Sequence, residues 1–267
     1  MNIIDEILNA LAQPRSAVVY LLGGTDTGKT TLTAQIANQL SEHNIAILDG
    51  DIGQSGVLPL TLSLLRVERQ FSSLSELPIV SQEFIPGYDL LHNLERNARS
   101  LGNLAQEART WAQYCLVDTT GFIEGPGVDL KRREIEEVKP DLIVALHRSQ
   151  EVEPILKGIK QRWMQFRVPC SMGSKSEEER RQRRYLRLSS YFQHSSLTEI
   201  RVKGVPVPFQ CEGRIVGLYG KRFLGLGVVK GIHHGKLHVL TPVAADPQRV
   251  EFTSVRFNPT GVLPKGH

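Results

Sequence analysis

A glycine-rich segment near the N-terminus, followed by a lysine and a threonine, has the composition of a phosphate-binding loop. Gly23 and Gly28 are five positions apart, and Lys29 and Thr30 follow directly. Glycines let the backbone fold around a polyphosphate with its N–H groups pointing inward, and the next helix adds the positive end of its dipole. In this pattern the lysine reaches the β- and γ-phosphates, and the threonine hydroxyl holds magnesium. The segment therefore predicts a nucleoside-triphosphate site made of Gly23, Gly24, Thr25, Asp26, Thr27, Gly28, Lys29, Thr30 and Thr31.

Acidic residues follow two later apolar runs. Asp118 closes one of them, and Asp49 and Asp51 follow the run at 45–48. Parallel α/β sheets collect their ligands at the carboxyl ends of the strands, so Asp118 is placed to organise magnesium. Asp49 and Asp51 would face the same side of a continued strand, so one can contact metal while the other approaches a substrate hydroxyl. The competing interpretations are a capping role for Asp118 and a turn-forming role for Asp49 and Asp51.

The most basic stretch of the chain follows Ser176. Ser176 and Glu179 form a capping box, which predicts a helix over 176–192. Arg180, Arg184 and Arg187 would lie within a sector of roughly 60° on this helix, separate from an apolar stripe of Tyr185, Leu188 and Phe192. An arginine row of this kind suits a lid that closes over phosphates and supplies charge to a transition state. The alternative is a solvated surface helix with an ion pair between Glu177 and Arg181.

Strands and helices alternate along the first two-thirds of the chain. This alternation predicts a parallel sheet covered on both faces by helices. After about residue 195 the helical period gives way to short strand-like runs separated by glycines. We therefore predict an α/β domain at 1–194, with its lid helix near 176–192, and a small β domain at 195–267. The expected strands are 17–22, 45–48, 114–117 and 142–146, and the expected helices are 3–12, 90–112, 130–138 and one near 151–161. A further helix, after the phosphate loop, has Leu32, Ile36 and Leu40 on one face.

Composition indicates the kind of partner and compartment that the protein has. The chain has 267 residues, 40% of them hydrophobic, and a net charge of +4 that favours an acidic partner such as nucleic acid. Its three cysteines form no closely spaced pair, and no apolar run is long enough to span a membrane. We expect a soluble cytoplasmic protein without a membrane partner. His233, His234 and His238 have no acidic or cysteine companions in sequence, so we expect no metal site there.

Taken together, these segments resemble the polynucleotide 5′-hydroxyl kinase family, P-loop kinases related to the RNA kinase of the pre-mRNA cleavage factor and to ribosomal-RNA-processing kinases. The resemblance covers nearly the whole chain. It is carried by Asp26 within the phosphate loop, by Asp49-Gly50-Asp51-Ile52-Gly53-Gln54, by a clasp at Thr119-Thr120-Gly121-Phe122, by a basic lid motif with Lys175, Arg180 and Arg184, and by the C-terminal β region.

The resemblance implies a P-loop NTPase fold that transfers the γ-phosphate of ATP or GTP, with Mg²⁺, to the 5′-hydroxyl end of single-stranded RNA or DNA. It makes Asp51 the general base, with Asp49 and Asp118 near the metal. Phe122 stands where the family often has tryptophan, and Lys175 where the lid often has arginine. The implied catalytic residues are Lys29, Asp51, Arg180 and Arg184, the substrate contacts Gln54, Thr120, Gly121, Phe122 and Lys175, and the metal contacts Thr30, Asp49 and Asp118.

Two other functions compete with the kinase. A regulatory GTPase is favoured by Asp118 and Gly121, whose spacing fits an element that senses a γ-phosphate, but no guanine-reading motif follows the strand at 142–146. A nucleotide-binding subunit of an RNA-processing complex with weak catalysis fits the β domain and the basic charge. The presence of Lys29, Asp51 and Arg180 argues against that second alternative.

Overall fold

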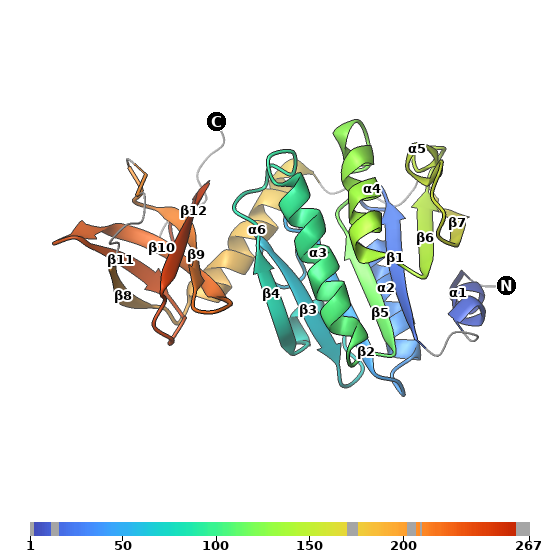
Figure 1. The fold of residues 1–267 in the computed structure, drawn as a ribbon, viewed down its shortest axis with the longest axis horizontal. Helices are drawn as coiled ribbons and strands as arrows, with labels where there is room; N and C mark the ends of the chain where they lie inside the picture. Colours follow the sequence, from blue (N-terminus) through green and yellow to red (C-terminus); the bar gives the residue numbers. More distant parts are fainter. Residues whose placement is uncertain (1–2, 12–15, 170–175, 202–206, 209, 260–267) are drawn as a thin grey trace.

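The protein contains two β-sheets, and one long helix lies between them (Figure 1). The structure is a computed structural model that describes residues 3–11, 16–169, 176–201, 207–208 and 210–259. A seven-stranded sheet with helices on both faces forms the larger part, and a five-stranded sheet lies beside it. The predicted α/β fold with a small C-terminal β domain is confirmed.

The larger sheet has the strand order β4-β3-β2-β5-β1-β6-β7. Its centre is parallel, whereas β3 pairs antiparallel with both β2 and β4. The sequence pattern predicts the four central strands, but not β3, β4 or β7. The strands are β1 (Ala17–Gly23), β2 (Ile45–Gly50), β3 (Thr61–Val67), β4 (Ile79–Phe84), β5 (Tyr114–Thr119), β6 (Leu142–His147) and β7 (Trp163–Arg167).

Helices cover both faces of this sheet because alternate side chains of the central strands point to opposite sides. Val19 and Leu21 of β1 pack with the residues of α1 and α2, and Val18 and Leu22 pack on the other face with α3, α4 and α5. The described helices of this part are α1 (Ile3–Leu11), α2 (Lys29–Gln39), the short 3₁₀ helix η1 (Leu74–Glu76), α3 (Leu94–Arg109), α4 (Pro126–Val138) and α5 (Glu153–Leu156). Each is too short or too polar to cross a lipid bilayer, as is every other helix in the described part of the chain.

The second sheet is antiparallel throughout, in the order β12-β9-β10-β11-β8. Its strands are β8 (Ser196–Arg201), β9 (Arg214–Tyr219), β10 (Phe223–His233), β11 (Lys236–Thr241) and β12 (Arg249–Arg256).

Helix α6 (Glu177–Phe192) lies between the two sheets (Figure 1). Leu188 and Phe192, near its C-terminal end, are buried with Phe84 of the larger sheet and with Leu226 of the smaller one. Tyr191 adds a hydrogen bond, because its hydroxyl accepts from the backbone N–H of Leu226 at 2.8 Å. The C-terminal half of α6 is therefore built into a shared core, and its N-terminal half extends toward the phosphate loop.

Candidate phosphoryl-transfer site

The phosphate loop connects β1 to α2. Gly28 has φ 91°, a left-handed conformation that favours glycine, and it is the N-cap of α2. The Lys29 Nζ donates to the carbonyl oxygens of Gly23 and Gly24, each at 2.8 Å, and the Thr27 hydroxyl donates to Gly24 at 2.9 Å. The lysine is thus held inside the loop that the sequence predicts to bind phosphates.

Lys29 is buried, and burial lowers the pKa of its ammonium group to about 8. The carboxylates of Asp118, Asp51 and Asp26 act in the opposite direction, because a nearby negative charge favours the protonated amine. A buried lysine with a perturbed pKa inside such a loop is typical of a functional site.

Thr30 and Asp118 meet directly, as the metal prediction requires. The Thr30 hydroxyl donates to Asp118 Oδ2 at 2.5 Å, while Asp118 Oδ1 is buried without a hydrogen-bond partner in the described structure. A buried, unpartnered carboxylate oxygen beside a threonine hydroxyl fits Mg²⁺, which takes oxygen ligands and completes its shell with water and phosphate. The described residues contain no cluster of three or more His, Cys, Asp or Glu side chains that could hold a metal without such additional ligands.

Asp49 lies on β2 directly beside Asp118 on β5. Burial raises the pKa of Asp49 to about 7, with a further contribution from the charge of Asp118. Burial also raises the pKa of Asp118 to about 6, although Lys29 opposes that shift. Two adjacent buried carboxylates with raised pKa values form a place where a cation would be strongly attracted.

The carboxylate of Asp49 also holds the turn that follows β2. Its Oδ2 accepts from the Ser55 hydroxyl at 2.7 Å and from the Val57 N–H at 3.3 Å, and its Oδ1 accepts from the Asp51 N–H at 3.4 Å. Asp51 Oδ1 accepts from the N–H groups of Gly53 and Gln54 at 3.1 and 2.9 Å. These bonds fix the position of Asp51 relative to the sheet edge.

A single cavity of about 770 Å³ brings most of the predicted residues together. Its walls come from the phosphate loop and α2, the segment after β2, the end of β5 and helix α6. The predicted residues that line it are Thr25, Asp26, Gly28, Lys29, Thr30, Thr31, Asp49, Asp51, Gln54, Asp118, Gly121, Arg180 and Arg184. Gly23, Gly24, Thr27, Thr120 and Phe122 do not line it, and Lys175 is outside the described residues.

The clasp meets the phosphate loop at Gly121. A Cβ at this position would lie 2.5 Å from Thr25 Cα, so only glycine permits the close approach. Phe122 turns toward the start of α4 instead, where a Cβ at Gly127 would come within 3.3 Å of its ring. The structure therefore brings Gly121 to the cavity and places Phe122, predicted to stack on a base, outside it.

Helix α6 begins where the sequence predicts. The Ser176 hydroxyl accepts from the Glu179 N–H at 3.2 Å, and the Glu179 carboxylate accepts from the Ser176 N–H at 2.7 Å. One turn into the helix, Arg180 forms an ion pair with Asp26 of the phosphate loop at 2.7 Å. The guanidinium of Arg184 lies 5.2 Å from the centre of the Tyr88 ring. The first arginine of the row thus contacts the phosphate loop directly.

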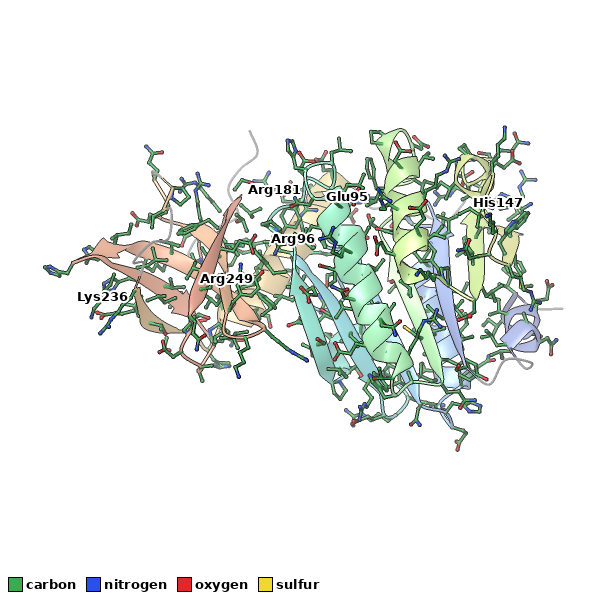
Figure 2. The ribbon with its side chains drawn as sticks, in the orientation of Figure 1. Glu95, Arg96, His147, Arg181, Lys236 and Arg249 are labelled. Carbon is green, nitrogen blue, oxygen red and sulfur yellow. The ribbon has the colours of Figure 1, made fainter. Side chains whose placement is uncertain are left out.

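Two arginines belong to the site although the sequence pattern assigned them no role there. Arg148 donates to the carbonyl oxygens of Thr25 at 3.1 Å and Asp26 at 2.8 Å, so it braces the outside of the loop. It directly follows His147, which Figure 2 labels at the end of β6. Arg183 of α6 lines the cavity, as does Arg187 of the predicted arginine row. A basic residue directly after an apolar strand is the sequence feature that identifies Arg148.

A buried polar cluster lies under the loop, on the α3 and α4 side of β1. Lys131 and Glu134 form a fully buried ion pair at 2.8 Å. Glu134 also accepts hydrogen bonds from the Tyr20 hydroxyl and from Asn97, the latter at 2.8 Å. The cluster connects α3 and α4 to the strand that leads into the phosphate loop.

Comparison with known proteins agrees with this architecture. Residues 23–194 match the family model described as the mRNA cleavage and polyadenylation factor CLP1 P-loop. The chain is similar to the polyribonucleotide 5′-hydroxyl-kinase of Pyrococcus horikoshii, with 37% identity over 208 residues that cover 77% of this chain and 57% of the relative. A polyribonucleotide 5′-hydroxyl-kinase of Methanocaldococcus jannaschii is 35% identical over 194 residues, which cover 71% of this chain and 54% of the relative. The chain thus spans little more than half the length of these relatives.

Solved structures show the same fold at much lower sequence identity. The structure of wild-type Clp1p in complex with Pcf11p has a TM-score of 0.73 at 12% identity, covering 95% of this chain and 79% of that one. A second structure, of the extended interface between Pcf11p and Clp1p, has a TM-score of 0.74 at 13% identity with the same coverage. The likeness extends over both sheets.

Proposed function

Since the chain belongs to the mRNA cleavage and polyadenylation factor CLP1 P-loop family, we propose that it transfers the γ-phosphate of ATP or GTP to the 5′-hydroxyl end of single-stranded RNA or DNA. The observation that carries this proposal is that Asp51 and Arg180 line the same cavity as Lys29 and Thr30. A phosphate donor, a base for an alcohol and a mobile positive charge are the components that phosphoryl transfer requires. The names of the relatives, polyribonucleotide 5′-hydroxyl-kinases, support the choice of acceptor.

The positions of the side chains support the following roles. Asp51, fixed by the N–H groups of Gly53 and Gln54, accepts the proton of the attacking 5′-hydroxyl. Lys29 and Arg180 stabilise the negative charge that spreads over the transferring phosphoryl group, and Arg184 supports them from the next turn of α6. Arg180 leaves Asp26 for the phosphates when the triphosphate is bound, exchanging one anionic partner for another.

Magnesium fits the same geometry. Thr30 and Asp118 would hold the ion, and when bound it neutralises charge on the donor phosphates. Asp49 lies beside them, but its hydrogen bonds to Ser55 and Val57 favour a part in holding the turn over direct ligation. Asp49 therefore influences the metal through its charge and positions Asp51 through the turn.

The proposed acceptor contacts are Gln54 and Gly121, which line the cavity, together with Thr120, Phe122 and Lys175 from the family resemblance. The position of Phe122 outside the cavity means that it reaches a base only if the clasp changes conformation on binding. Gln54 donates through its amide to the Gly53 carbonyl at 2.8 Å, which keeps its side chain near Asp51.

Transfer of label tests the proposal. The protein is incubated with magnesium, γ-labelled ATP or GTP, and oligonucleotides of RNA and DNA that carry a 5′-hydroxyl. We expect label on the oligonucleotide with the wild-type protein, and none with Lys29→Ala or Asp51→Asn. An oligonucleotide blocked by a 5′-phosphate is the matched control and should stay unlabelled. Label released only as free phosphate would contradict the kinase and favour the hydrolytic alternative.

A further inference from the structure

The cavity continues well beyond the phosphate loop, and we propose that its outer part is a binding site for the nucleic-acid chain that follows the 5′-terminal nucleotide. This inference rests on the proposed function and adds a strand-binding subsite to it. The site lies between α2 and α6 and is lined by Gln35, Asn38, Phe71, Arg183, Leu186 and Arg187.

One wall of the site is a row of arginines on α6. Residues 180, 183 or 184, and 187 follow one another along one helix face at intervals of three or four positions. Arg183 and Arg187 therefore lie about 4.5 and 10.5 Å farther along the helix axis than Arg180, which is held against the phosphate loop. The positive charge thus extends along α6, away from the phosphate loop.

An exposed apolar side chain interrupts this charged row. Leu186 lines the cavity although its side chain is largely exposed at 57% of its area. Proteins bind single-stranded nucleic acids with basic side chains that contact the phosphates and with apolar or aromatic side chains that contact the bases. Such binding tolerates many sequences. Leu186 between Arg183 and Arg187 provides both components on one face of the helix.

The opposite wall is rigid before any ligand binds. The Asn38 side chain of α2 donates to the Phe71 carbonyl at 3.0 Å and accepts from the Phe71 N–H at 3.1 Å, so the segment before η1 is fixed to α2. Leu74 of η1 packs against the turn after β2, where a Cβ at Gly56 would lie 2.9 Å from it. Since α6 is anchored by its C-terminal half, the part of this wall that carries Leu186 and Arg187 is in place before a strand binds.

Size and charge agree with this occupant. A cavity of about 770 Å³ lies in the upper part of the usual range for a single small ligand, roughly 300–1,000 Å³. It also extends along the whole exposed side of α2, from Thr30 to Asn38. The basic residues of the outer part match the phosphates of a polynucleotide, and the polar Gln35 and Asn38 offer hydrogen bonds to sugars and bases.

Binding measured without phosphate transfer tests the proposal. The fluorescence anisotropy of a 3′-labelled, 5′-hydroxyl hexanucleotide is followed at several KCl concentrations for the wild-type protein and for Arg183→Ala/Arg187→Ala. Each lost phosphate contact lowers the slope of log affinity against log salt by about 0.7 for a single strand, so we expect the double variant to lose about 1.4. Leu186→Ala should weaken binding and leave the slope unchanged, because it removes no charge.

Two controls separate this site from general basic charge. Arg181→Ala removes an arginine of the same helix that does not line the cavity and is labelled in Figure 2, and it should leave the slope unchanged. Arg183→Lys/Arg187→Lys keeps the charge and should retain most of the slope. An unchanged slope in the double alanine variant, or an equal loss in Arg181→Ala, would overturn the proposal.

Transfer kinetics give an independent readout. With the double alanine variant, the KM for a hexanucleotide should rise several-fold while the KM for a nucleoside 3′-phosphate, which lacks the nucleotides that follow the first, stays at the wild-type value. An equal rise for both acceptors would refute a separate strand subsite and leave the kinase proposal standing. Absence of transfer to either acceptor would refute the kinase proposal, and the binding measurement would still decide the subsite.

Discussion

The buried carboxylate of Asp49 lowers the free energy of unfolding of the protein. Its carboxyl is buried with a pKa raised to about 7, whereas in an unfolded chain it titrates near its ordinary value of 3.8. Above pH 7 the folded protein must therefore keep a charge that its surroundings disfavour. A group with a raised acidic pKa lowers the free energy of unfolding most at high pH, and this penalty disappears as pH falls below the unfolded value.

We predict that Asp49→Asn raises the free energy of unfolding at pH 8, without magnesium, by on the order of 1 kcal/mol. The amide oxygen can keep the hydrogen bond from Ser55 that the carboxylate accepts. The gain should be smaller at pH 5 and absent below pH 4, and urea unfolding at the three pH values measures it. Asp51→Asn, whose carboxylate is less buried, is the matched control. A constant gain at all pH values would show that the charge of Asp49 is not its source.

Removing one charge from the buried pair of Lys131 and Glu134 should lower the free energy of unfolding, unlike the substitution of Asp49. Lys131→Met leaves the Glu134 carboxylate in the core without its cation, so it should lower the free energy of unfolding by about 3–5 kcal/mol. Lys131→Met/Glu134→Gln should recover most of that loss, because glutamine can still serve Tyr20 and Asn97. Urea unfolding of the wild type and of both variants measures the effect. Equal losses in the single and double variants would contradict the role of the buried charge.

Among the helices, the sequence predicts an end correctly where neighbouring residues alone determine it. Helix α6 begins after Ser176 as predicted because the capping box uses only neighbouring residues. Helix α3 begins at Leu94 and not near Leu90, because the Asp89 carboxylate accepts from the N–H of Leu91 and forms a turn. Helix α5 covers only Glu153–Leu156, a fraction of the predicted 151–161. Apolar spacing does not show such competing turns.

The site residues also fall into those that a local motif reveals and those that only the fold brings together. Lys29 and Thr30 were recognisable because the phosphate loop is a continuous motif, and Asp51 because it follows a strand end. The contact of Arg148 with Thr25 joins residues 123 positions apart, and only the pairing of β1 with β6 brings them together. The strands β3, β4 and β7 were not predicted for a similar reason, since their pairing with distant partners is decided by the whole sheet.

The attachment of α6 to the smaller sheet yields a prediction for this element. Tyr191→Phe removes the hydroxyl that accepts from the Leu226 N–H, leaving a poorly solvated amide and a cost of about 1–3 kcal/mol. Because the same helix carries Arg180, kcat for transfer should fall while nucleotide affinity changes little. Gln182→Ala, an exposed position of α6, is the control for urea unfolding and kinetics. An unchanged stability and kcat for Tyr191→Phe would show that this anchor does not position α6.

For the whole molecule, the two sheets behave as parts that share a core. The predicted boundary between residues 194 and 195 stays a prediction: α6 precedes it and ends at Phe192, yet that residue is buried with Leu226 beyond it. Phe84 of β4 stacks on Phe223 of β10 at 5.7 Å, and it would collide with any side chain at Gly217 of β9. A change in the position of α6 at its C-terminal end would therefore involve the smaller sheet as well.

An ion pair joins the two sheets at a second place. Arg96 of α3, labelled in Figure 2, donates to both carboxylate oxygens of Glu251 on β12, with one bond at 2.9 Å. Its guanidinium also donates to the Tyr219 hydroxyl at 3.1 Å, and that hydroxyl donates to Glu251 at 2.9 Å. The bidentate geometry and the shared tyrosine make this contact stronger than an ordinary surface pair, although partial exposure reduces its energy.

We predict a coupling of about 1 kcal/mol between Arg96 and Glu251 in a double-mutant cycle of Arg96→Ala, Glu251→Ala and the double variant. Because α6 packs against the sheet that this ion pair attaches to α3, each single variant should also lower kcat for transfer. The charge swap Arg96→Glu/Glu251→Arg should restore part of kcat. Urea unfolding measures the coupling, and label transfer at saturating nucleotide measures kcat. Lys236→Ala is the control, because Lys236 forms its ion pair with Glu199 of β8, within the smaller sheet. If the pair couples in stability but kcat stays at the wild-type value, the smaller sheet stabilises the protein without setting the position of the lid.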